Sequence, residues 1–214
     1  MDASAYGHQC LQGSPLSGSE DCLLVNVFRK TNTRANAGVP VLFWIHGGGF
    51  TGGSGGAVEN HEGGDYYDGR YLAGHDTNNV IVLSINYRLG AMGFKGVSDK
   101  VGGGTGRLNA INDMVVALEW ARDSVAAFGG DPDQITVFGE SAGALSICML
   151  TVSPRAAGLF NQAILESGAC THESYWGVGD FEESEYPSSA ELRTSLSRHL
   201  CREYVLMQYH VIVC

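Results

Sequence analysis

The 214-residue chain is long enough for one domain with a substantial hydrophobic core, and 44% of its residues are apolar. Its 23 acidic and 13 basic residues give a net charge of −10, which disfavours nucleic acids and anionic membrane surfaces as partners. No segment has the length and apolarity of a transmembrane helix, and residues 1–6 have neither the basic nor the apolar stretch of a secretion signal.

Strands and helices are predicted to alternate after an N-terminal loop over residues 1–18. Apolar and β-branched runs predict strands over residues 23–28, 39–45, 80–86, 134–138 and 160–166. Helices or helical turns are predicted over residues 71–74, 113–128, 144–150 and 190–200. Asp113 is expected near the start of its helix, where a carboxylate suits the positive helix end, and residues 129–132 are expected to end that helix. The alternation predicts an α/β fold, one domain over residues 1–214 with a mostly parallel central sheet flanked by helices.

The segment over residues 136–144 combines a predicted strand, the motif G-x-S-x-G and the start of a helix. This arrangement is typical of the nucleophile elbow of an α/β-hydrolase, in which a very tight turn forces the serine into strained backbone angles. Glycines two residues before and two residues after Ser141 allow the strand and the helix to approach closely. The sequence therefore predicts that Ser141 is a catalytic nucleophile.

A glycine turn with the sequence His-Gly-Gly-Gly-Phe, at residues 46–50, follows the predicted strand over residues 39–45. Esterases use such a turn to point backbone N–H groups at a developing oxyanion, and glycine lets a substrate carbonyl approach the main chain. We assign the N–H groups of Gly48, Gly49 and Ala142 to this oxyanion hole, the last because it follows the serine at a helix N-terminus. A flexible loop is the alternative interpretation of the glycine run, and it is disfavoured because turn and elbow occur in the expected order.

These motifs resemble the type-B carboxylesterase and cholinesterase family of serine hydrolases. The blocks that match lie at residues 19–27, 46–50, 85–90, 117–122, 128–132, 136–144 and 163–168. The resemblance covers about residues 10–168, in order and with the family's spacing. The blocks S-E-D-C-L and F-G-G-D-P separate this family from hormone-sensitive-lipase-like enzymes. Residues 106–114 depart from the family's pattern and keep clearly only Asp113 and the apolar positions.

The resemblance implies an α/β-hydrolase that cleaves small-molecule or lipid carboxylic esters through an acyl-enzyme on Ser141, with no cofactor and no metal. It also implies that Glu140 lies in the active site and tunes its electrostatics, the alternative being a simple polar residue of the elbow. Arg88 is expected to be a scaffold residue that pairs with an acidic residue near the elbow. His46 is expected to have a structural role in the turn.

No motif in the chain frames the acid and the histidine of a catalytic triad. In the family both lie far downstream, in a chain more than twice this length, so the sequence is expected to be an N-terminal-to-central fragment without them. Asp180 followed by His199 or His210 has the required order, and His172 is a further histidine after Ser141. Each of these histidines is expected to be a surface or loop residue.

Cysteine usage bears on the cellular compartment. Cys10 and Cys22 flank a short loop rich in Gly, Ser and Pro, and the resemblance implies that they form the family's first disulfide, two free thiols being the alternative. Cys201 and Cys214 could imitate a later family bridge, and Cys148 is expected to be a small core residue. A disulfide suggests a secreted or secretory-pathway protein, although the chain shows no signal peptide.

The sequence allows three interpretations of function. The first is the nucleophile-bearing part of a carboxylic-ester hydrolase. The second is a non-catalytic, cholinesterase-like binding or adhesion module, but such proteins typically lose the serine that this chain keeps at Ser141. The third is an inactive truncated product, whose open sheet edge would make the isolated chain fold poorly. The sequence predicts neither the oligomeric state nor the acyl and alcohol specificity.

Overall fold

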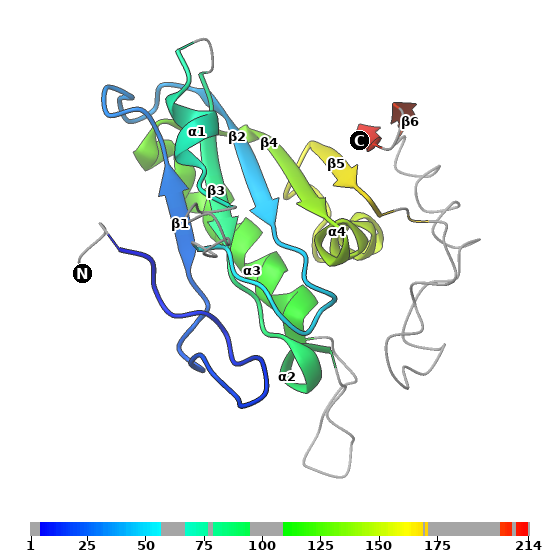
Figure 1. Ribbon diagram of the computed structural model, residues 1–214. Coiled ribbons are helices and arrows are strands. Elements are labelled where there is room, and N and C mark those ends of the chain that lie inside the picture. The colour runs from blue at the N-terminus through cyan, green and yellow to red at the C-terminus, as the bar shows by residue number, and fades with distance from the viewer. Residues whose placement is uncertain are drawn as a thin grey trace.

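The computed structural model describes residues 5–56, 67–76, 79–94, 109–168, 170, 202–206 and 209–213, the last two ranges by their backbone. Within these residues seven strands form one sheet in the order β1-β3-β2-β4-β5-β7-β6 (Figure 1). The strands are β1 (Val25–Phe28), β2 (Val39–Ile45), β3 (Ile81–Ile85), β4 (Gly130–Glu140), β5 (Gln162–Glu166), β6 (Arg202–Leu206) and β7 (Tyr209–Val213).

The sheet is mostly parallel, as the sequence predicts. The central strands β3, β2, β4 and β5 are parallel neighbours, whereas β1 runs antiparallel to β3, and β7 runs antiparallel to both β5 and β6. All five predicted strands are present, although β4 begins at Gly130 rather than at residue 134. The hairpin of β6 and β7 was not predicted from the apolar run over residues 205–213, and it pairs with β5 at the edge where an open strand was expected.

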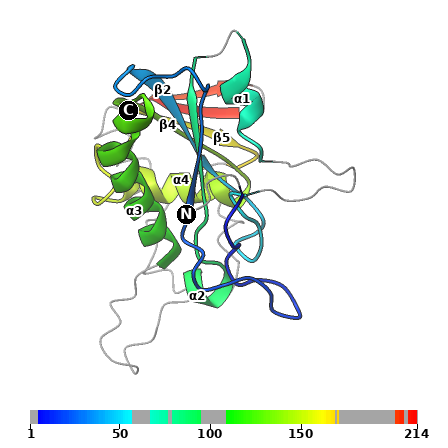
Figure 2. The same cartoon turned by 90° about the vertical axis from the view of Figure 1, so that its left-hand side faces the viewer.

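Helices cover the two faces of the sheet unequally in the described part of the chain. α3 (Asn109–Ser124) and α1 (Arg70–Gly74) lie on opposite sides of the strands (Figure 2). α4 (Ala142–Val152) packs with α3 against the same hydrophobic core. α2 (Gly90–Phe94) lies beside the start of α3. The helix predicted over residues 113–128 instead begins at Asn109 and ends in a 3-10 turn over Val125–Phe128. Gly129 stops this turn as expected, with a φ of 101°. The helix predicted over residues 190–200 lies outside the described residues.

The hydrophobic core lies between the sheet and the helices α3 and α4. In the central strands every second side chain points to these helices and is fully buried, namely Val41, Phe43, Ile45, Ile81, Leu83, Ile85, Ile135, Val137, Ala163 and Leu165. Residues 142–150 of α4 are also all buried, which fits a helix that is apolar on every side. This packed layer holds the carboxyl ends of β2 and β4, where the two predicted motifs lie.

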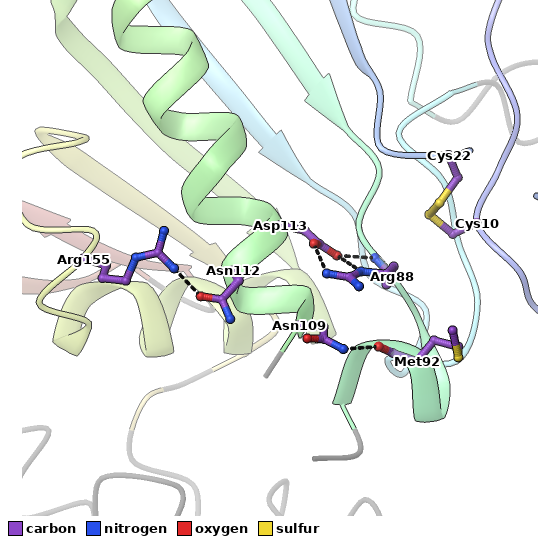
Figure 3. Close-up of polar contacts among 8 residues, drawn as sticks. All are labelled: Cys10, Cys22, Arg88, Met92, Asn109, Asn112, Asp113 and Arg155. Atoms are coloured by element: carbon purple, nitrogen blue, oxygen red, sulfur yellow. Dashed lines mark hydrogen bonds and ion pairs between the residues drawn. A yellow bond between two sulfur atoms is a disulfide. The ribbon is translucent and has the colours of Figure 1, made fainter. Parts of the chain in front are cut away.

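An ion pair joins the end of β3 to α3 (Figure 3). The guanidinium of Arg88 donates from Nε and Nη2 to the carboxylate of Asp113, at 2.8 and 2.6 Å, and the Arg88 backbone N–H donates to it at 3.1 Å. Because α3 begins at Asn109, the carboxylate lies a full turn inside the helix, so its expected role at the helix start is wrong. Arg88 pairs with an acidic residue as expected, and this partner, Asp113, stands on α3.

Two disulfides are formed among the described residues. Cys10 and Cys22 are bonded, as the resemblance implied (Figure 3). Cys148 is buried, but it is bonded to Cys170, so the prediction of a simple core cysteine is wrong. This second bridge ties α4 to the segment that follows β5. Cys201 and Cys214, the other pair considered, lie outside the described residues.

Candidate active site

Ser141 stands alone between the last residue of β4 and the first residue of α4. Its φ of 54° and ψ of −118° are strained for a residue with a Cβ, as predicted for a nucleophile elbow. Its backbone N–H donates to the carbonyl oxygen of Glu166 at 2.9 Å, and its own carbonyl accepts from the N–H of Leu145 at 3.0 Å. The neighbouring strand and the first turn of α4 therefore hold the strained conformation from both sides.

The two motif glycines of the elbow lie where no side chain fits. A Cβ on Gly143 would come within 2.1 Å of the carbonyl oxygen of Ile45, and a Cβ on Gly139 would come within 2.7 Å of the same oxygen. The Cβ on Gly139 would also lie 2.9 Å from the carbonyl carbon of Gly143. The ends of β2 and β4 and the start of α4 thus meet at one point, which is the close approach that the spacing of G-x-S-x-G predicts.

The glycine turn that follows β2 lies directly against this elbow. A Cβ on Gly47 would lie 2.8 Å from the carbonyl oxygen of Glu140 and 3.3 Å from the Cβ of Ser141. Gly48 and Gly49 have φ values of 108° and 59°, which favour glycine, so the chain reverses within the turn. The structure therefore brings the two predicted motifs into contact.

The three N–H groups assigned to the oxyanion hole have no acceptor among the described residues. The carbonyl oxygen of Gly48 accepts from the N–H groups of Thr51 and Gly52, both at 3.1 Å, whereas the N–H of Gly48 itself donates to none of the described groups. The same holds for the N–H groups of Gly49 and of Ala142, the first residue of α4. Unengaged N–H groups at a helix N-terminus and in a glycine turn can stabilise an oxyanion.

The side chain of His46 supports the glycine turn over residues 46–50. Its Nδ1 lies 2.7 Å from the carbonyl oxygen of Gly47, which only accepts, so Nδ1 bears the proton. The ring stacks on Tyr87 with centroids 4.2 Å apart, and the Tyr87 hydroxyl donates to the carbonyl oxygen of His46 at 2.7 Å. Burial lowers the pKa of His46 to about 4 because it desolvates the charged ring, and the hydrogen bond to Gly47 opposes this shift only in part. The buried Nε2 has no hydrogen-bond partner among the described residues. The imidazole is therefore neutral at pH 7, and its hydrogen bond orients the peptide whose N–H belongs to Gly48.

A pair of carboxylates lies at the carboxyl ends of β4 and β5. Glu140 and Glu166 are partners in the register of these strands, and burial together with the charge of Glu140 raises the pKa of Glu166. A Cβ on Gly47 would lie 2.9 Å from Oε2 of Glu140, so this carboxylate is adjacent to the glycine turn. Glu140 directly precedes Ser141, and its expected role in tuning the electrostatics of the active site stays a prediction. Glu166 is a further acidic neighbour that sequence reasoning missed, and its only signal was a place at the end of the next predicted strand.

Among the described side chains, the structure places no candidate triad histidine beside Ser141. His172, His199 and Asp180 lie outside the described residues. His210 lies on β7, opposite Leu165 in the register of β5, and its side chain is not described. The described part of the chain contains no cluster of three or more metal-binding side chains. No helix in that part is long and apolar enough to cross a membrane.

A sequence model described as the carboxylesterase family matches residues 1–185. The chain belongs to the carboxylesterase family. Among curated members, para-nitrobenzyl esterase of Bacillus subtilis (strain 168) is 45% identical over an alignment of 178 positions, and the match covers 79% of this chain and 34% of that protein. Acetylcholinesterase of Gallus gallus is 46% identical over 153 residues, which are 71% of this chain and 18% of that protein.

Solved structures of carboxylesterase-family proteins share the fold of this chain. A PNB esterase has a TM-score of 0.68 at 46% identity, covering 79% of this chain and 34% of its own. A Geobacillus stearothermophilus carboxylesterase also has a TM-score of 0.68, at 37% identity, covering 91% of this chain and 42% of its own. The family resemblance and the α/β-hydrolase fold expected from the sequence are thereby confirmed. The chain spans about a third of the length of its Bacillus relative.

Proposed function

We propose that this chain contains the nucleophile and the oxyanion hole of a serine carboxylic-ester hydrolase. The observation that supports this most strongly is the strained Ser141 in contact with a glycine turn whose N–H groups are unengaged among the described residues. Relatives named esterase and carboxylesterase support the same reaction class. Small-molecule or lipid esters are the proposed substrates, and neither a cofactor nor a metal takes part.

The proposed reaction is acyl transfer in two steps. Oγ of Ser141 attacks the ester carbonyl carbon while its proton passes to a base, and the carbonyl oxygen becomes an oxyanion. The N–H groups of Gly48, Gly49 and Ala142 stabilise this oxyanion, with the N-terminal end of α4 adding a favourable dipole. The alcohol leaves with the transferred proton, and water then hydrolyses the acyl-enzyme by the same route.

The general base is a histidine other than His46. The ring of His46 is buried against Tyr87, and its Nδ1–H is committed to the carbonyl oxygen of Gly47. His172, His199 and His210 remain the candidates that this chain offers after Ser141, with Asp180 as a candidate acid. Glu140, beside the elbow, is proposed to stabilise the imidazolium that forms during the reaction.

The site belongs to a single, partial α/β-hydrolase domain that is proposed over residues 1–214. Two buried disulfides, Cys10–Cys22 and Cys148–Cys170, favour folding in an oxidising compartment such as the secretory pathway.

Hydrolysis of p-nitrophenyl butyrate by the purified chain tests the proposal. We expect turnover that is lost in Ser141→Ala and kept in Ser153→Ala, a matched change just beyond the end of α4. Equal rates in the chain and in Ser141→Ala would contradict catalysis by this chain. That result is the one expected of a non-catalytic binding module, of an inactive product, or of a chain that holds the nucleophile and the oxyanion hole without the triad acid and histidine. Selective loss in Ser141→Ala would make His172→Ala, His199→Ala and His210→Ala the next variants.

A further inference from the structure

The segment after the glycine turn is held by side-chain amides instead of a strand partner. The N–H of Gly53 donates to Oε1 of Gln12 at 2.8 Å, and its carbonyl oxygen accepts from Nε2 of the same side chain at 2.9 Å. Two residues later, Asn86 accepts from the N–H of Gly55 at 2.7 Å. One amide group of Gln12 thus gives Gly53 the pair of hydrogen bonds that a neighbouring strand would give.

Gly53 in turn lies against the hydrogen bond between His46 and Gly47, which supports the oxyanion hole. A Cβ at this position would come within 2.4 Å of Nδ1 of His46 and within 2.6 Å of the carbonyl oxygen of Gly47. These two atoms form the hydrogen bond that orients the peptide between Gly47 and Gly48. Since a peptide is planar, any displacement of the Gly47 carbonyl also turns the N–H of Gly48.

Gln12 is itself well fixed. Its Nε2 also donates to the carbonyl oxygen of Cys10 at 3.1 Å, and its backbone exchanges hydrogen bonds with Ser17 at 2.9 and 2.8 Å. The disulfide between Cys10 and Cys22 closes the loop around it. A side chain anchored in this way can resist movement of Gly53, which a freely rotating surface glutamine could not do.

We propose that Gln12 is a positioning residue for the oxyanion hole and acts on the N–H of Gly48 through Gly53. It touches neither the substrate nor Ser141 in this role. The inference rests on the proposed esterase function, because the donor it positions is assigned there. The disulfide loop thereby has a role in the reaction besides its contribution to stability.

Gln12→Met tests the inference, because methionine has a similar length and cannot form the two bonds to Gly53. Gln162→Met is the matched control, since among the described residues its exposed amide bonds only to Thr136, at the opposite end of the sheet. Removing an oxyanion-hole donor lowers kcat by about 10²–10³-fold, so a displaced donor is expected to lower it by about 10-fold. KM is expected to stay within about twofold, since the donor acts mainly in the transition state. A kcat equal to that of the Gln162→Met control would overturn the inference.

Gln12→Glu separates positioning from a general loss of structure. At neutral pH its carboxylate can accept from the N–H of Gly53 but has no donor for the carbonyl oxygens of Gly53 and Cys10. Protonation, near pH 4.3 for an ordinary glutamate and higher beside these oxygens, restores an O–H donor. The rate of Gln12→Glu relative to the wild type is therefore expected to rise as the pH falls from 7 to about 5. A constant ratio over this range would count against the inference.

Amide hydrogen exchange gives a readout that needs no turnover. We expect the N–H groups of Thr51 and Gly52, which donate to Gly48, to exchange faster in Gln12→Met, and that of Leu145 in α4 to be unchanged. Unchanged exchange at the turn would refute the positioning role. Faster exchange in a chain without Ser141-dependent turnover would refute the proposed function and leave the positioning role intact.

Discussion

Replacing Gly143 by alanine is expected to push the nucleophile elbow away from the end of β2. The new Cβ would lie 2.1 Å from the carbonyl oxygen of Ile45 and 3.0 Å from that of His46. Both oxygens belong to the main chain, so neither can rotate away as the end of a long side chain could. Reaching even a 3 Å contact with Ile45 requires α4 and β2 to separate by about 1 Å in a close-packed interior.

The magnitude follows from two opposing effects on Gly143→Ala. Alanine in a helix is favoured over glycine by up to about 1 kcal/mol. Overpacking of a tight core costs about 1–3 kcal/mol. The free energy of unfolding is therefore expected to fall by up to about 2 kcal/mol. A shift of about 1 Å in the reacting geometry can cost about 100-fold in rate, so kcat should suffer more than stability.

Urea unfolding and Ser141-dependent ester hydrolysis together measure this effect. Gly74→Ala is the matched control, because a Cβ on Gly74 meets nothing within 4 Å and should leave both quantities nearly unchanged. A Gly143→Ala protein with the unfolding free energy and kcat of the control would refute the reasoning, since it would show that β2 and α4 are not in contact at this point.

Two further predictions concern stability. We expect removal of either disulfide, by Cys10→Ala/Cys22→Ala or by Cys148→Ala/Cys170→Ala, to lower the free energy of unfolding by about 3 kcal/mol. The two effects should be similar because loops of 12 and 22 residues have similar closure entropies. Losses under about 1 kcal/mol in urea unfolding of both double variants would contradict this estimate. The pKa of His46 is about 4 in the folded chain, against an ordinary value of 6.5. Between pH 4 and pH 6.5 the unfolded chain therefore binds more protons than the folded chain, so the free energy of unfolding should fall as the pH falls through this range. Over that range the wild type should lose about 3 kcal/mol more than His46→Asn, and parallel stability curves would show that burial does not keep the imidazole neutral.

The local geometry of the site could be predicted from the sequence because it depends on neighbours in the chain. The motif around Ser141 specifies a strand, a strained turn and a helix within nine residues, and glycine at two positions follows from the tightness of that turn. The continuous apolar runs that became β2 and β3 similarly predict strands buried on both faces. Because parallel strands carry their loops at the same edge, the meeting of turn and elbow followed from the fold class.

The features that were missed depend on contacts between distant segments. The bridge from Cys148 to Cys170 requires the chain after β5 to return to α4, which the spacing of the two residues does not indicate. The pairing of Glu140 with Glu166 depends on the register between β4 and β5. The start of α3 at Asn109 was missed because the departure from the family pattern over residues 106–114 hid its first turn.

A binding site made of main-chain N–H groups constrains the chain around it. The N–H groups that meet the ligand must stay out of any strand ladder, so the turn has to be held by its carbonyl oxygens and by the segments next to it. His46 holds the carbonyl of Gly47, and Gln12 holds both backbone groups of Gly53. Both supporting groups are neutral at pH 7, so they satisfy these backbone groups without placing a second charge beside the developing oxyanion.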